Sequence, residues 1–258
     1  MSKYLEYFNG AFDSTVAEKI KPENKPYVAY SKIDGVVYTV ISKEPTSAYQ
    51  MVDLGLPSGL KWADRNVGAS SPEDAGLYFS WGNVDGHAVD ENGNVIDGYS
   101  FFNTYSTTLG GQYTGSTLDA EHDAATVNMG SDWRVPTIDE ISELVQNTDR
   151  YYIGEDGSIV GSSELDGSKL RSICFVKKGE SFNYDNHSNF IEIPFAGKCN
   201  ASSLDSRGVA GFVWSSSAYN GNAEEALHLY FSNYGIFGGS IATRTSRFAG
   251  QSVRGVRA

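Results

Sequence analysis

The 258-residue sequence has few positive charges and no long hydrophobic run, and each absence excludes a class of protein. Lys and Arg number 20 against 32 Asp and Glu, which gives a net charge of −12 at pH 7. A general nucleic-acid-binding protein needs a basic face, so we expect no nucleic-acid partner. No apolar stretch approaches the roughly 18 residues that identify a membrane-spanning helix, so we expect no membrane span.

Residues suited to metal binding or covalent catalysis are also scarce. Only two cysteines occur, Cys174 and Cys199, and each stands beside apolar residues, which predicts two buried thiols rather than a disulfide framework. The four histidines lack paired ligand spacing, and Asp90-x-Asn92-x-Asn94 lacks the glycine and closing glutamate of a calcium loop. No phosphate-binding loop, dinucleotide fingerprint or G-x-S-x-G motif is present. We therefore predict no enzymatic activity, no cofactor and no metal site.

Glycine and tyrosine, by contrast, are plentiful, with 28 and 16 residues. This composition favours a turn-rich β or α+β protein over a helical bundle. Residues 1–48 are expected to form a separate β-rich unit, in which strands over 27–32 and 36–42 flank an Asp-Gly turn. Because a lone hairpin is too small to be stable, it must dock on the domain of residues 49–258 or on another subunit.

Local signals place two helices and then several strands in residues 49–258. Thr137 followed by Glu140 is a capping box, and apolar residues at helical spacing from Ile138 to Val145 predict a helix there. A shorter helix is expected over 118–129, with Ala120, Ala124, Ala125 and Val127 packing. A turn with strands on either side is expected around Asn92-Gly93. Later strands are expected around a second Asp-Gly turn in YYIGEDGSIVG and in LRSICFVKK, NFIEIPFAG, GFVWSSSAY and ALHLYFSNYG.

The segment of residues 228–250, HLYFSNYGIFGGSIATRTSRFAG, contains no Lys, Glu, Gln, Met, Trp or Pro. Alternation places the Leu and Phe side chains of 227–231 on one face, which we expect to be core, and His228, Tyr230 and Ser232 on the other. Two interpretations of that second face stay open. It binds a ligand, since Tyr, Ser, Gly and Asn are favoured in binding surfaces, or it belongs to an interior strand covered by the N-terminal unit.

Several motifs occur in an order that resembles the Fibrobacter succinogenes major paralogous domain. They are VDLGLPSGLKWA, NVGA, PEDAGLYFSWG, DAATVNMGSDWRVPT, GFVWSSS and RFAGQSVRGVR, from about Met51 to the C-terminus. The family is abundant in gut Bacteroidetes and their phages and is similar to formylglycine-generating-enzyme-like C-type-lectin folds. The resemblance implies an α+β, C-type-lectin-like fold with two helices, short antiparallel strands and much irregular loop, preceded here by the small β-rich unit.

Some members of that superfamily resemble the variable proteins of diversity-generating retroelements, whose C-terminal Asn codons are mutagenised at adenines. Such codons never yield Lys, Glu, Gln, Met or Trp, the types missing from 228–250. In a variable segment of about 219–250, the resemblance implies scaffold roles for the closing residues Arg247, Gly250, Ser252, Val253 and Arg254. The ligand-contacting residues that it implies are Tyr219, His228, Tyr230, Ser232, Tyr234, Ile236, Phe237, Ile241, Thr243, Thr245, Ser246 and Phe248.

The function implied by this resemblance is non-enzymatic ligand binding, as a phage or prophage receptor-binding or display protein. The expected partner is a host-surface protein or glycan held on the diversified C-terminal face, where Arg244 and Arg247 would stack or pair. Residues 1–48 would attach the protein or make it a homotrimer. The opening MSKYLEYFNG has no basic start followed by an apolar run, so we expect no secretory signal. Synthesis in the cytoplasm and display on a virion or another surface are therefore expected.

Two other functions stay open. One is a fixed bacterial surface or adhesion module whose C-terminal face is merely core. The other is a relic oxidase of the formylglycine-generating type, which would need a copper site at Cys174 and Cys199. Such enzymes use a cysteine pair near the C-terminal end of the fold, and here no cysteine follows Cys199. This departure from the family pattern argues against oxidase activity.

Overall fold

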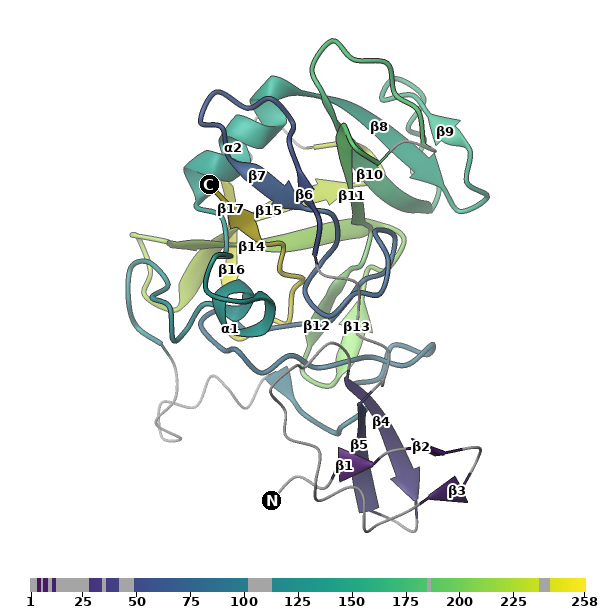
Figure 1. Ribbon diagram of the computed structural model, residues 1–258, viewed down its shortest axis with the longest axis vertical. Coiled ribbons are helices and arrows are strands. Elements are labelled where there is room, and N and C mark those ends of the chain that lie inside the picture. The colour runs from purple at the N-terminus through teal and green to yellow at the C-terminus, as the bar shows by residue number, and fades with distance from the viewer. Residues whose placement is uncertain are drawn as a thin grey trace.

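The structure is a computed structural model that describes residues 4–5, 7–8, 11–12, 28–33, 36–41, 49–101, 113–184, 187–236 and 242–258. In these residues two α-helices combine with several small sheets whose strands are mostly antiparallel (Figure 1). The predicted α+β class is confirmed. No helix in the described part of the chain is both long and apolar enough to cross a membrane.

The predicted N-terminal hairpin is present. Strands β4 (Val28–Ile33) and β5 (Val36–Ile41) pair antiparallel, within a residue of the expected bounds, and β1 (Tyr4–Leu5) adds to β5 in parallel. The short strands β2 (Tyr7–Phe8) and β3 (Ala11–Phe12) pair with each other. The Asp-Gly turn lies outside the described residues, and the docking of this unit stays a prediction.

A four-stranded antiparallel sheet has the order β11-β10-β8-β9. Its strands are β8 (Thr148–Gly154), β9 (Ile159–Val160), β10 (Leu170–Lys177) and β11 (Phe190–Pro194). The second Asp-Gly turn joins β8 to β9, and Gly157 has a φ of 83°, a conformation that glycine adopts without a side-chain clash. The sequence therefore predicted this sheet's strands correctly.

A second sheet, of order β14-β15-β16, carries the C-terminal segment. Its strands are β14 (Ala210–Ala218), β15 (Glu225–Ser232) and β16 (Ala242–Ser246), and β12 (Lys198–Asn200) forms a separate pair with β13 (Ser203–Asp205). The last strand, β17 (Val256–Arg257), returns to β7 (Lys61–Ala63), which also pairs with β6 (Met51–Val52). The C-terminus thus lies beside the first strands of the large domain (Figure 1).

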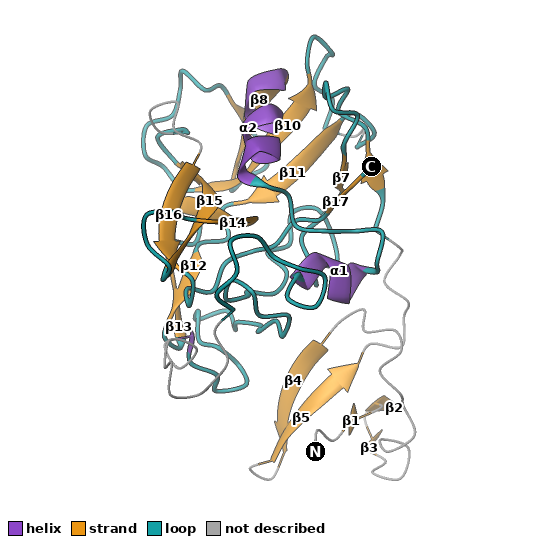
Figure 2. Cartoon of the chain, turned by 90° about the vertical axis from the view of Figure 1, so that its left-hand side faces the viewer, coloured by secondary structure: helices purple, strands orange, loops and turns teal. Residues whose placement is uncertain are grey.

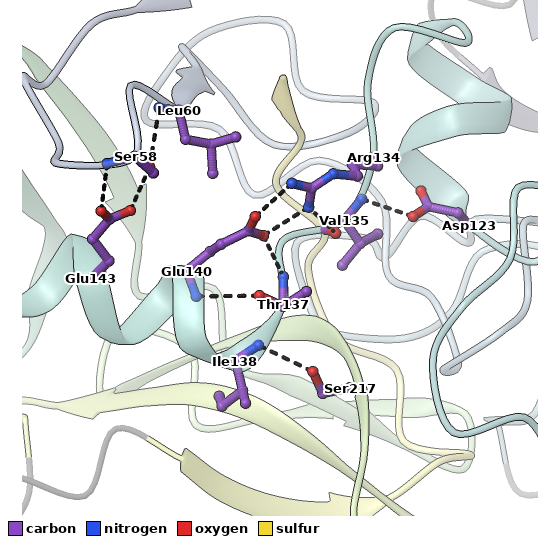
Figure 3. Close-up of polar contacts among 10 residues, drawn as sticks. All are labelled: Ser58, Leu60, Asp123, Arg134, Val135, Thr137, Ile138, Glu140, Glu143 and Ser217. Atoms are coloured by element: carbon purple, nitrogen blue, oxygen red, sulfur yellow. Dashed lines mark hydrogen bonds and ion pairs between the residues drawn. The ribbon is translucent and has the colours of Figure 1, made fainter. Parts of the chain in front are cut away.

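Helix α2 (Ile138–Asn147) begins as the sequence predicts. The Thr137 hydroxyl accepts from the Glu140 backbone, and the Glu140 carboxylate accepts from the Thr137 backbone and pairs with Arg134 (Figure 3). On the next turn, Glu143 accepts hydrogen bonds from the backbone and hydroxyl of Ser58. Because α2 contacts β8, β10, β14 and β15, its buried face joins the two main sheets (Figure 2).

Helix α1 (Ala124–Met129) is shorter than the predicted helix over 118–129. Asp123 is its N-cap, because one of its carboxylate oxygens accepts from Thr126 N at 2.8 Å. The other oxygen accepts from Val135 N, as Figure 3 shows. A capping side chain starts a helix where it satisfies the first free donors, which explains why residues 118–123 stay outside it. Ala124 is buried as expected, but Ala120 is exposed and Val127 is 51% exposed, so their predicted packing was wrong.

Of the predicted strands around Asn92-Gly93, only an isolated antiparallel bridge between Val89 and Val95 forms. The turn itself is tight, since Asp90 accepts from the backbone of Asn94 through its side chain at 2.8 Å. This part of the chain is therefore irregular, although the turn lies where the sequence placed it.

Candidate functional site

One face of β15 packs into the core as predicted, but much of the other face is buried too. Leu229 and Phe231 belong to the main hydrophobic cluster beneath α2. His228, predicted to contact a ligand, is only 3% exposed, and Ser232 is only 4% exposed. Neither side chain has the free surface that a ligand contact needs in this conformation.

The burial of His228 has a clear cause in the sheet and in the closing segment of the chain. On β14, Trp214 lies opposite His228 in register, and the Phe212 ring stands at its edge with a centroid distance of 5.7 Å. Above them, Nε2 of Gln251 lies 3.0 Å from Nδ1 of His228. Burial, with a smaller contribution from Lys198, lowers the pKa of His228 to about 3, so the ring is neutral at physiological pH.

The residues expected to be scaffold are interior and firmly held. Backbone bonds attach the closing segment on two sides: Gln251 N donates to Phe79 O, and Trp214 N donates to Ser252 O, each at 3.0 Å. The buried Arg247 guanidinium stacks over the Trp81 ring at 4.3 Å and donates to the backbone oxygen of Tyr113 at 2.7 Å. Arg247 therefore stacks as predicted, but beneath the surface.

Arg254 is fully buried and ties three parts of the domain together. It donates to Asn66 Oδ1 and Ala63 O, each at 2.9 Å, and to Glu192 O at 2.5 Å. Burial lowers its pKa to about 10, which still leaves the guanidinium charged at neutral pH. The scaffold prediction for the closing motif is consistent with these contacts.

The first surface region lies along β16, and we call Tyr219, Thr243, Arg244, Thr245 and Ser246 the β16 region. The Arg244 guanidinium lies 4.4 Å above the Tyr219 ring, and its Nε lies 3.2 Å from Glu225 Oε2. Arg244 is exposed, and the other four side chains are half-buried. With Arg244 stacked on its ring, Tyr219 offers a ligand both aromatic surface and a phenol hydroxyl.

The second surface region follows the end of β15. Tyr234 is 66% exposed, and its ring lies against Gly167, where any side chain would collide with the Tyr234 hydroxyl. Ile236, also predicted to contact a ligand, is half-buried and packs against the main core cluster. Of these two residues, Tyr234 presents the larger surface to a ligand.

A groove of about 360 Å³ opens beside this second region, and we call it the Asn233 groove. It was not predicted, although the sequence shows its acidic run between residues 154 and 169. The residues that line it are Gly154, Glu155, Asp156, Ser158, Val160, Glu164, Leu165, Asp166, Ser168, Lys169, Leu170 and Asn233.

The remaining predicted contact residues lie in neither region. Tyr230 is half-buried with its ring 5.1 Å from that of Phe212, and Phe248 is half-buried at the turn after β16. Phe237 and Ile241 lie outside the described residues. The eight-residue strand β15 separates Tyr219 from Tyr234, roughly 24 Å at the usual rise per strand residue. The predicted set therefore forms no single surface: part of it lies in two separate regions, and His228, Tyr230, Ser232 and Phe248 lie in neither.

No family model matches the chain, and no curated protein or solved structure matches it either.

The two cysteines are buried, as predicted, and stand in separate hydrophobic clusters. Burial raises the pKa of Cys199 to about 12 and also raises that of Cys174, so both stay protonated thiols at neutral pH. Within the described ranges, no group of three or more His, Cys, Asp or Glu side chains is placed to hold a metal ion.

Proposed function

We propose that this protein is a non-enzymatic ligand-binding protein, of the receptor-binding or display kind, with a C-type-lectin-like fold. Its C-terminal segment, diversified between copies of the gene, contacts a host-surface protein or glycan. The observation that carries this proposal is the division of the segment into two kinds of residue. Aromatic and hydroxyl side chains such as Tyr219 and Tyr234 reach the surface, whereas Arg247, Gln251 and Arg254 are locked in the interior.

This division supports a segment that tolerates change at the surface. A substitution at Tyr234 or Arg244 alters exposed area and leaves the interior hydrogen bonds of the closing segment in place. The sheet holds the β16 residues Thr243 to Ser246 in fixed positions before binding, which lowers the entropy lost when a ligand binds. Tyrosine adds large contact area with few rotatable bonds, and neighbouring hydroxyls add adaptable hydrogen bonds.

Multivalent display adds to the strength of binding. Residues 1–48 attach the protein to its carrier or join three copies, so that several C-terminal segments face the same target. Linked copies bind far more tightly than one copy when their spacing lets them engage together. The acidic surface of the domain, with its net charge of −12 for the whole chain, keeps free copies apart.

The fixed adhesion module is the second candidate, favoured by the burial of His228 and Ser232. In that case the β15 residues serve packing alone, and the surface regions do not vary between copies of the gene. The two candidates predict different effects of surface substitutions on binding.

A cell-binding experiment tests the proposal. Fluorescently labelled protein is titrated onto a panel of Bacteroides cells, and binding is measured by flow cytometry for the wild type and for Tyr219→Ser/Tyr234→Ser. A hot-spot aromatic contributes about 2 kcal/mol or more, so we expect binding to a responsive strain to weaken at least ~30-fold. The matched control, Ile96→Ser/Val127→Ser, removes exposed apolar side chains elsewhere and should bind normally. Equal binding by all three proteins would refute the proposed contact residues.

A further inference from the structure

The Asn233 groove brings three parts of the chain together around one small hollow. The β8–β9 turn supplies Asp156 and Ser158, the loop before β10 supplies Glu164 to Lys169, and Asn233 follows β15. Its volume of about 360 Å³ is near the lower end of the ~300–1,000 Å³ typical of ligand pockets. It is therefore large enough for one side chain or a small ligand.

The lining of the groove is strongly negative. Four carboxylates, those of Glu155, Asp156, Glu164 and Asp166, outnumber its one ammonium group, that of Lys169, by three. Backbone donors fix three of them: Ser158 N bonds Asp156 at 2.9 Å, Gly161 N bonds Glu164 at 3.0 Å, and Ser168 N bonds Asp166 at 2.9 Å.

The charge of Asp156 and Asp166 persists at neutral pH. Hydrogen bonds from Ser158 lower the pKa of Asp156, and those from Ser168 lower the pKa of Asp166. Each group is therefore ionised well below pH 7. Asp156 and Asp166 therefore supply fixed negative charge to the groove at physiological pH.

Asn233 adds a buried acceptor, its Oδ1 atom, which indicates that the ligand carries a hydrogen-bond donor. The residue is 4% exposed, and its Oδ1 has no hydrogen-bond partner, although the residue lines the groove. The orientation of the amide is fixed, because Nδ2 donates to both Gly167 O and Ser168 O. A flipped amide would set its oxygen against two carbonyl oxygens. A buried acceptor without a partner is destabilising, and a hydrogen bond donated by a ligand would remove that cost.

We propose that the Asn233 groove binds a cationic side chain, a guanidinium or ammonium group, presented by a protein ligand. The inference rests on the proposed ligand-binding function and names the chemistry recognised at one of its two surface regions. A guanidinium supplies charge-assisted donors to the carboxylates and a donor to Asn233. Tyr234, exposed beside the groove against Gly167, offers an aromatic face to the same cation. A neutral sugar would satisfy the acceptors but leave the carboxylate charge unpaired.

The test uses a pair of probes that differ in charge and little in shape. N-acetyl-arginine methylamide and its neutral citrulline analogue are titrated into the full chain and followed by calorimetry at low ionic strength. We expect a dissociation constant on the order of 1 mM for the arginine probe, at least tenfold weaker binding of the citrulline probe, and loss of affinity with added salt. Equal binding of the two probes would overturn the proposal.

A charge-removing variant locates the binding site. Asp156→Asn/Glu164→Gln/Asp166→Asn removes three charges while each new amide oxygen still accepts its backbone hydrogen bond. Because each exposed ion pair contributes only modestly, we expect the loss of three charges to lower the affinity for the arginine probe about tenfold. The control is Glu73→Gln/Glu91→Gln/Glu121→Gln, with the same change in net charge at exposed positions outside the groove. An equal loss in both variants would mean that net charge alone drives binding and would overturn the proposal.

A third probe and the cell-binding assay separate the remaining outcomes. The third probe is spermine. If it binds more than 100-fold more tightly than the arginine probe, the ligand is a free polyamine, and the proposal of a protein ligand is overturned. If the arginine probe fails while Tyr219→Ser/Tyr234→Ser still abolishes cell binding, the groove inference fails and the proposed function stands. If the arginine probe binds but Tyr219→Ser/Tyr234→Ser binds cells normally, the proposed function is wrong and the groove inference stands.

Discussion

Acid should destabilise this fold through His228, because the neutral ring is buried between Trp214, Phe212 and Gln251. The pKa of His228 is about 3 in the folded protein, against 6.5 in an unfolded chain. Below pH 6.5 His228 therefore becomes protonated in the unfolded state but stays neutral in the folded state. The stability contributed by this group is fully present above pH 6.5 and is lost progressively as the pH falls toward 3.

The magnitude follows from the size of that window. Each pH unit below 6.5 costs about 1.4 kcal/mol, so acidification to about pH 4 should remove about 3 kcal/mol through His228 alone. For a domain with ordinary stability of ~5–15 kcal/mol, this is a large fraction of the total.

Urea unfolding followed by tryptophan fluorescence measures the effect at about pH 7 and about pH 4. The matched variant is His228→Gln, whose amide fits a polar site but does not titrate. Carboxylates that protonate in both proteins contribute equally and cancel in the comparison. The wild type should lose about 3 kcal/mol more than the variant between the two pH values. Equal losses would refute a buried, neutral His228.

Two further predictions concern local structure. Thr137→Ala should lower the free energy of unfolding by about 1 kcal/mol in urea titrations, since the first turn of α2 loses its cap, whereas Thr137→Ser should be nearly neutral. Cys174 and Cys199 should react with a thiol reagent such as DTNB only on unfolding, because both thiols are buried with raised pKa values. Rapid labelling of native protein would contradict that burial.

The elements that the sequence predicted well are those with signals confined to a few neighbouring residues. The capping box of Thr137 and Glu140 and the Asp-Gly turn at Gly157 each satisfy backbone geometry locally, so their positions could be read directly. Helix α1 was predicted to begin too early because Ala120 fits a helical pattern, while Asp123 gives the backbone a better starting point. The sequence shows the helical pattern of these residues but not the hydrogen bonds of Asp123, so it could not show where α1 begins.

The burial of His228 depended on information that alternation does not carry. A period of two shows which residues share a face of β15, but not what covers that face. The cover comes from Gln251 and from the neighbouring strand through Trp214. The Asn233 groove could not be predicted for the same reason: it depends on contacts between distant parts of the chain. Its acidic residues lie between 154 and 169, and the fold places Asn233, which follows β15, beside them. Sequence reasoning therefore found the residue types of the surface and missed how they are grouped.

The central claim is that the C-terminal segment is a diversified binding face, and the DNA beside the gene tests it most directly. Sequencing of the locus should reveal a reverse transcriptase gene and a near-copy of the codons for residues 219–257 that differs only where the copy has adenines. The structure further predicts that the differing codons encode surface side chains such as Tyr219, Tyr234 and Thr245, and spare Arg247 and Arg254. A locus with no such copy and no reverse transcriptase would contradict diversification and leave a fixed module.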